Sequence, residues 1–135
     1  WYLIRHNEIE VLPTPFAWNG AVLLDNVGET KVLDATLAHN RFEISGWAGI
    51  ELSGTKGVRL IRNNVLGSGA SGILVSDSSE CLVLANDVSS FEPMADYGRI
   101  YLDSETRHCL VVGRHDAGDV VDMGEENVVI TFPPR

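Results

Sequence analysis

Two consecutive segments of the chain follow the same pattern: residues 40–62, NRFEISGWAGIELSGTKGVRLIR, and residues 63–85, NNVLGSGASGILVSDSSECLVLA. Each begins with Asn, and Asn86 opens a further copy 23 residues after Asn63. Short apolar stretches recur at matching places in both segments, separated by Gly, Ser, Asn and Asp. A fixed period in the low twenties indicates a solenoid, in which each repeat buries its apolar face against its neighbours.

The apolar pattern inside each repeat predicts short β-strands. Apolar residues alternate in three places per repeat, which in the first are Phe42 with Ile44, Ile50 with Leu52, and Val58 with Leu60. Alternation with period two is typical of strands, and the Gly-rich and Ser-rich stretches between them predict turns. Each repeat therefore corresponds to one coil of a parallel β-helix.

The recurring Asn resembles a feature of the right-handed parallel β-helix proteins of the pectate-lyase-like superfamily. In that family a stacked Asn occupies the short turn between the second and third strands, and Asn7, Asn40, Asn63 and Asn86 match it. The resemblance covers nearly the whole chain and implies an all-β fold, a right-handed parallel β-helix (solenoid) of about five coils. Asn tolerates the left-handed backbone conformation, and its amide can bond to the same residue one coil away. We predict that these residues are structural.

The pattern also places residues outside the regular repeats. Ile100 and Leu102 match Ile73 and Val75, which leaves the segment 89–98 as an inserted loop. Cys81 and Cys109 fall at the same place in successive coils and face the core, where we expect free thiols rather than a disulfide. His6 and His39 each precede a ladder Asn, so their rings can approach each other on the outer surface, where we expect a solvated position rather than a metal site with two imidazole ligands.

Length and charge limit the partners. The 135 residues make one domain, 1–135, and no apolar run approaches the ~20 residues of a membrane span. The net charge of −9 argues against nucleic acid and anionic membrane surfaces. Tyr2 and Ile4 match the inward positions of a coil, so we expect the sequence to start inside a coil. We expect either a fragment of a longer polypeptide, which we favour, or an end covered by another chain.

The resemblance implies a site on the outer face of the first strand of each coil, beside the loop before it. The candidate substrate-binding residues there are Trp18, Trp47, Tyr97, Arg99 and Tyr101. Trp18 and Trp47 each precede a strand-opening Gly by two residues, so they should be neighbours about 4.8 Å apart. Aromatic rings can cover the apolar face of a neutral sugar. The alternative is that both Trp rings only cover turns and core.

Catalysis is the weaker hypothesis. Glycoside hydrolysis needs two carboxylates, and Glu51, Asp96 and Asp103 are the candidates for acid and base. The polygalacturonase motifs of the family are not intact, since Arg99-Ile100-Tyr101 departs from Arg-Ile-Lys at its third residue. Pectate lyases use a Ca²⁺ cluster and a basic groove, whereas this groove would be acidic. We expect no cofactor and no metal site, with calcium as the open alternative.

Three functions therefore stand as hypotheses. The leading one is a carbohydrate-associated module, binding or structural, without an intact catalytic motif; it would lie at the cell surface or outside the cell and have a polysaccharide or oligosaccharide as its partner. The second is a polysaccharide lyase or glycoside hydrolase, and the third is a structural stalk or assembly segment. A sheet face with Leu82, Leu84, Leu110 and Val112 pointing outward needs a cover. Either the segment 128–132 folds back over it or, as we favour, a second copy of the chain does.

Overall fold

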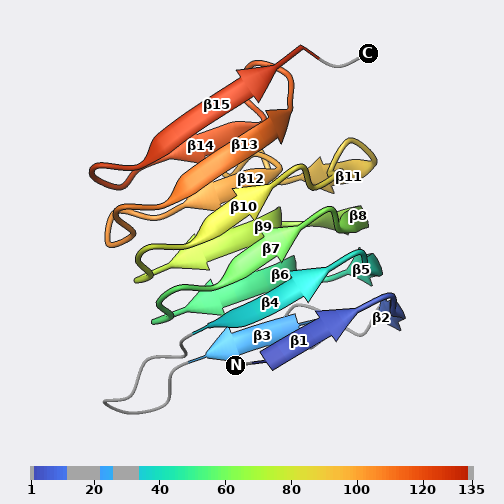
Figure 1. Cartoon of the computed structure of the whole chain (residues 1–135). Helices are drawn as coiled ribbons and strands as arrows, with labels where there is room; N and C mark the ends of the chain where they lie inside the picture. Colours follow the sequence, from blue (N-terminus) through green and yellow to red (C-terminus); the bar gives the residue numbers. More distant parts are fainter. Residues whose placement is uncertain (1, 12–21, 26–33, 134–135) are drawn as a thin grey trace.

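The protein's structure, a computed structural model, describes residues 2–11, 22–25 and 34–133. Every regular element in these ranges is a β-strand, and the strands form three parallel sheets that the chain visits in turn (Figure 1). This confirms the predicted all-β fold with parallel strands. We call one passage through the three sheets a coil. Within the described ranges no helix is long and apolar enough to cross a membrane.

The three sheets are named A, B and C in the order in which a coil crosses them. Sheet A contains β1 (Tyr2–Arg5), β4 (Ala35–Ala38), β7 (Arg59–Ile61), β10 (Leu82–Leu84), β13 (Leu110–Arg114) and β15 (Val128–Phe132). Sheet B contains β2 (Glu8–Val11), β5 (Arg41–Ser45), β8 (Asn64–Gly69) and β11 (Phe91–Pro93). Sheet C contains β3 (Val22–Asp25), β6 (Ala48–Ser53), β9 (Ser71–Ser76), β12 (Ile100–Leu102) and β14 (Val120–Asp122).

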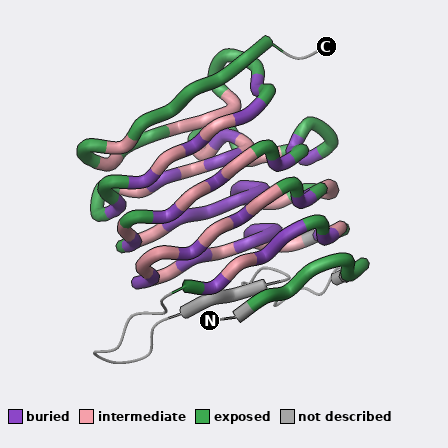
Figure 2. Tube along the Cα trace, in the orientation of Figure 1, coloured by how far each residue is buried: buried purple, intermediate pink, exposed green. Residues whose placement is uncertain are grey.

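The core consists of matching residues stacked from coil to coil. Ile50, Ile73 and Ile100 pair in register along sheet C, and all three side chains are fully buried. Phe42 pairs with Val65 in sheet B, and both side chains are also fully buried. The buried column runs through the middle of the stack, while β15 is exposed along its length (Figure 2). The predicted inward positions and their register are therefore confirmed for these residues.

The asparagine ladder forms as predicted, at the corner between sheets A and B. Asn63 Nδ2 donates to Asn86 Oδ1 at 3.0 Å, and Asn40 Nδ2 donates to Asn63 Oδ1 at 3.1 Å. Each Nδ2 also donates to a backbone carbonyl of the preceding coil, which for Asn63 is that of Leu37. Asn7 joins the ladder at its other end through Asn40. These residues are structural, because their side-chain amides supply one another's hydrogen-bond partners inside the corner.

One of the two reasons for expecting Asn at these positions, its tolerance of the left-handed backbone conformation, was wrong. The left-handed residue of this turn is the one before each Asn, and it varies in type: His6, His39, Arg62 and Ala85, with φ between 51° and 57°. Because those residues carry the backbone strain, Asn is required for its carboxamide alone. A second left-handed column precedes the strands of sheet A, at Asp34, Gly57, Glu80, His108 and Glu126. Its mixed residue types explain why the sequence did not reveal it.

One of the two covers expected for the apolar face of Leu82, Leu84, Leu110 and Val112 was wrong: the segment 128–132 does not fold back over it. β15 pairs edge to edge with β13, with Leu110 opposite Val128 and Val112 opposite Ile130. It therefore extends sheet A and does not fold back over the outer face of Leu82 and Leu110. The apolar surface continues onto β15, where Val128 is 52% exposed and Ile130 is 44% exposed.

The two cysteines are stacked as expected, and both are free and buried. The Cys81 N–H points to Cys109 Sγ at 3.4 Å. A hydrogen bond from the Cys109 thiol lowers the pKa of Cys81 to about 7, and the same contact, reinforced by burial, raises the pKa of Cys109. A thiolate near neutral pH is reactive only where a reagent can reach it.

We therefore expect no labelling of either cysteine in the native protein. Titration with a thiol reagent at pH 7.5 should detect two thiols after denaturation and none before it, because each residue is only 2% exposed. Fast labelling of the native protein would show that the two side chains do not face the core. Failure to detect thiols after non-reducing denaturation would indicate a disulfide.

Candidate functional site

The outer face of sheet C carries the predicted site. Glu51, Leu74 and Tyr101 lie side by side on β6, β9 and β12. Leu74 is only 6% exposed, although its neighbours Ile73 and Val75 are the residues that face the core. Side chains on the outer face must therefore cover it. The outer face of sheet C is therefore partly shielded from solvent at Leu74.

Three aromatic rings gather on this side of the molecule. The rings of Trp47 and Tyr97 lie 5.6 Å apart between centroids at an interplanar angle of 74°, and those of Tyr97 and Tyr101 lie 5.1 Å apart at 53°. All three residues are partly exposed. Trp47 lies just before β6 and Tyr101 is on β12, so Tyr97 bridges residues two coils apart. Trp18, the remaining predicted aromatic residue, lies outside the described residues.

The segment that carries Tyr97 is more ordered than a loop. We predicted an insertion over 89–98, but Phe91–Pro93 form β11 and pair with the end of β8. Asn64 bridges Asp87, whereas Gly67 pairs with Phe91, so this segment contains one extra residue relative to β8. Gly67 has φ of 115°, and a Cβ on it would lie 1.8 Å from the Ile44 carbonyl oxygen. The inward position opposite it is filled by the fully buried Phe91.

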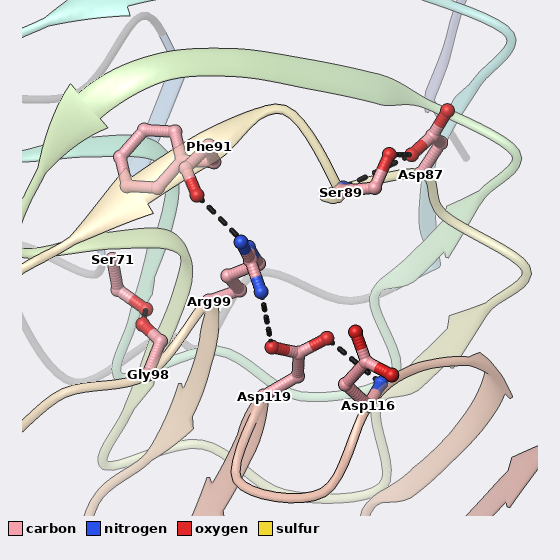
Figure 3. A network of polar contacts seen from close by, with 8 residues as sticks. All are labelled: Ser71, Asp87, Ser89, Phe91, Gly98, Arg99, Asp116 and Asp119. Carbon is pink, nitrogen blue, oxygen red and sulfur yellow. Dashed lines mark hydrogen bonds and ion pairs between the residues drawn. The ribbon is translucent and has the colours of Figure 1, made fainter. Parts of the chain in front are cut away.

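Polar contacts fix the end of this segment, as Figure 3 shows. Arg99 Nε donates to the Phe91 carbonyl at 2.9 Å, and its Nη1 forms an ion pair with Asp119. The Ser71 hydroxyl donates to the Gly98 carbonyl at 2.9 Å. These bonds tie Gly98 and Arg99, which directly follow Tyr97, to β9, β11 and the turn before β14. Arg99, predicted to bind substrate, has its guanidinium engaged within the protein.

The predicted carboxylates are placed differently from one another. Asp103 accepts hydrogen bonds from the Ser76 hydroxyl at 2.8 Å and from the N–H groups of Asp77 and Glu105 at 3.1 and 3.0 Å. This carboxylate organises the turn after β12. Glu51 is partly buried on β6, and Asp96 is exposed in the segment before Tyr97. A catalytic role for these three residues stays a prediction.

The predicted approach of His6 and His39 is confirmed at the corner between sheets A and B. Their rings stack with centroids 5.3 Å apart at an angle of 12°, and both residues are exposed. Arg62 occupies the same corner position one coil further on. In the described part of the chain, no three His, Cys, Asp or Glu side chains come together to hold a metal ion.

A cleft that the sequence pattern did not predict lies where the asparagine ladder ends. β13 does not turn at Gly113 as β10 turns at Ala85, but continues to Arg114 beside Phe132 of β15. The divergence opens a cleft of about 670 Å³ lined by Leu84, Ala85, Asn86, Asp87, Ser89, Val112, Gly113, Arg114 and Phe132. The signal in the sequence was Arg114, which follows Cys109 by five residues, as Asn86 follows Cys81.

A buried histidine lies behind this cleft. His115 is 5% exposed, and a Cβ on Gly113 would lie 2.6 Å from its Nε2. The ring therefore occupies the space that any other residue at 113 would fill. Burial lowers the pKa of His115, with the nearby Asp119 and Asp87 acting in the opposite direction. The imidazole is thus neutral at physiological pH.

Comparison with protein-family models, with curated proteins and with solved structures finds no match to this chain.

Proposed function

We propose that this protein is a carbohydrate-binding module whose binding surface is the aromatic cluster Trp47, Tyr97 and Tyr101. The observation that carries the proposal is a cluster of three partly exposed rings from two coils that are not adjacent, in which Tyr97 contacts both Trp47 and Tyr101. Ring faces cover the apolar C–H faces of pyranoses, and partly exposed aromatic residues at fixed positions suit recognition. The bonds of Arg99 and Ser71 support this role, because they hold the segment of Tyr97 in place before a ligand arrives.

The ring geometry favours a soluble oligosaccharide over a crystalline polysaccharide. A flat crystal face needs coplanar rings, whereas these rings meet at 74° and 53° and form a bent surface. The surroundings are acidic, since Glu92 and Asp96 are exposed in the same segment and the chain carries a net charge of −9. A neutral sugar therefore fits better than an acidic one.

The architecture that we propose is a right-handed parallel β-helix like that of the pectate-lyase-like superfamily. Support comes from the fixed order in which the chain visits the three parallel sheets and from the asparagine ladder at one corner. Because glycans of this kind occur mainly outside the cell, we propose an extracellular or cell-surface location. Asp103 is committed to its turn, which favours binding over polysaccharide cleavage.

Replacing Tyr97 with alanine tests the binding surface. We expect about tenfold weaker affinity for neutral oligosaccharides, because the loss of one aromatic contact of about 0.5–1.5 kcal/mol corresponds to up to roughly a tenfold change. Calorimetric titration of a panel of soluble neutral and acidic oligosaccharides measures it. Trp47→Ala should act in the same direction. Phe132→Ala is the matched control, since Phe132 is exposed on sheet A and far along the chain from the cluster.

Two results would contradict the proposal. If the wild-type protein binds none of the neutral sugars, the rings serve only to cover Leu74. If the protein releases new reducing ends or unsaturated products from a polysaccharide, it is the enzyme of our second hypothesis. In that case, Glu51→Gln and Asp96→Asn identify which carboxylate takes part.

We further propose that two copies of the chain associate through the outer face of sheet A. Because β15 extends the sheet, it does not cover Leu82 and Leu110, and both side chains are partly exposed. The face continues onto Val128, which lies opposite Leu110 and is 52% exposed. Continuous apolar surface of this kind marks an interaction site. Replacing Leu82 and Leu110 with Lys should convert a dimer into a monomer in light scattering. The measurement uses about 100 μM protein, a concentration at which even weak dimers form. If the wild-type protein is a monomer under these conditions, this interface does not exist.

A further inference from the structure

The last rung of the asparagine ladder is incomplete. Asn7, Asn40 and Asn63 each donate both the backbone N–H and one Nδ2–H to the Oδ1 of the next Asn, at 2.9–3.1 Å. In the next coil, Arg114 occupies the sequence position at which the next ladder Asn is expected. No carboxamide oxygen therefore follows Asn86 in the ladder. In the described part of the chain, the N–H of Asn86 makes no hydrogen bond, and its Nδ2 donates only to the Leu60 carbonyl at 2.9 Å.

These two donors belong to a residue that is only 4% exposed. A buried N–H group without an acceptor costs about 1–3 kcal/mol, so an oxygen atom placed at this point would be strongly favoured. The ladder itself shows the geometry, since Asn86 Oδ1 accepts from both donors of Asn63 at 2.9 and 3.0 Å. A single oxygen of an incoming group can therefore take both donors of Asn86.

The surroundings of Asn86 define the rest of such a group. The cleft of about 670 Å³ lies within the range of about 300–1,000 Å³ that is usual for small-molecule sites. Leu84, Val112 and Phe132 form its apolar wall. Arg114 also lines it, and the hydrogen bond of Nη1 to the Pro133 carbonyl is the one made by its guanidinium within the described residues.

We propose that this cleft binds a small molecule with a single carboxylate on an apolar body. One carboxylate oxygen accepts from the two N–H donors of Asn86, and the other faces the guanidinium of Arg114. The apolar body packs against Leu84, Val112 and Phe132. Asp87 also lines the cleft, and its Oδ1 accepts from the N–H and hydroxyl of Ser89 at 3.0 and 2.6 Å. Its negative charge disfavours a ligand with a second carboxylate.

Calorimetric titration with 3-phenylpropanoate tests the site, with 3-phenylpropanamide and 3-phenylpropan-1-ol as matched probes. We expect the acid to bind, the amide to bind at least tenfold more weakly and the alcohol not to bind measurably. Arg114→Gln should weaken acid binding at least tenfold, and Arg62→Gln should not change it. Arg62 is a matched control because it is exposed at the same corner, one coil before Ala85.

A second variant addresses Asn86 directly. Asn86→Asp keeps the oxygen that accepts from Asn63 but replaces the Nδ2 donor by an anionic oxygen, so acid binding should be lost. Far-ultraviolet circular dichroism of each variant establishes that it is folded. Absence of acid binding to the wild-type protein would overturn the proposal. So would acid binding that Arg114→Gln leaves unchanged, or an amide that binds as tightly as the acid. Tyr97→Ala should leave acid binding intact, which separates this site from the sugar-binding surface.

Discussion

Replacing Asn63 with alanine is expected to lower the free energy of unfolding by about 3 kcal/mol. Asn63 is one of the two inner rungs of the four-rung ladder and is 1% exposed. The substitution removes the oxygen that accepts from the N–H and Nδ2 of Asn40, and it removes the side-chain donor to Asn86 while the backbone N–H donor remains. No backbone strain is added, because the left-handed residue of this turn is Arg62. Urea unfolding monitored by circular dichroism measures the loss.

Position in the ladder provides internal controls for this result. Asn64→Ala changes the exposed next residue and should shift stability by less than about 0.5 kcal/mol. Asn7→Ala removes an exposed end rung, and a smaller loss than at Asn63 is expected because water can replace its bonds. Equal stability of Asn63→Ala and Asn64→Ala would mean that the ladder contributes no stability.

The regular coils could be predicted because three independent signals agree in them. Period-two alternation marks the strands, Gly and Ser mark the turns, and Asn fixes the register of each copy. Confirmation extends to residues in the less regular coils. Cys81 and Cys109 stack, and Ile100 and Leu102 pair with Ile73 and Val75. A repeat transfers information from a clear copy to an unclear one, since both must pack against each other.

The parts that could not be predicted are those in which the copies differ. β11 was expected as loop because Pro93 and the added residue obscure the alternation. The pairing partner of Arg99 lies 20 residues away in a turn with no counterpart in earlier coils, so nothing in the sequence linked it to Asp119. The left-handed positions are set by the path of the backbone, and residues as different as His, Arg and Ala occupy them.

The candidate site likewise has one part that could be predicted from the sequence and one part that could not. The outward positions on sheet C follow from register, so Glu51 and Tyr101 could be assigned to one face. Contact between Trp47 and Tyr97 depends on how the segment after β11 returns, which is a tertiary property. The cleft at Asn86 arises because β13 extends past the corner, and the strand length there is decided by pairing with β15. A missing Asn indicates that the ladder ends, but it does not indicate what shape replaces it.

Replacing Phe91 with alanine is expected to cost about 3–5 kcal/mol, the range for removing a buried aromatic ring from a core. Phe91 is fully buried and is among the largest of the core side chains. Its ring lies opposite Gly67, which has no side chain to fill the space that would be vacated. The Gly67 backbone is also held in a left-handed conformation against Ile44, so it is not free to move into the cavity. Chemical unfolding measures the change, with Glu92→Ala, an exposed neighbour on the same strand, as control.

The same substitution should weaken sugar binding in the protein that remains folded. The Phe91 carbonyl accepts from Arg99, and Arg99 holds the segment that carries Tyr97, so a shift of β11 moves a ring of the cluster. Phe91→Leu retains much of the side-chain volume, and we expect it to lower the free energy of unfolding by only about 1 kcal/mol, as is usual for volume-conserving core substitutions. Sugar affinity should then stay within about twofold of the wild-type value. If Phe91→Ala is as stable as Glu92→Ala, the segment 89–98 is a surface loop as the sequence suggested. If stability falls while sugar affinity is unchanged, Tyr97 is held without β11, and the positioning role of Arg99 is wrong.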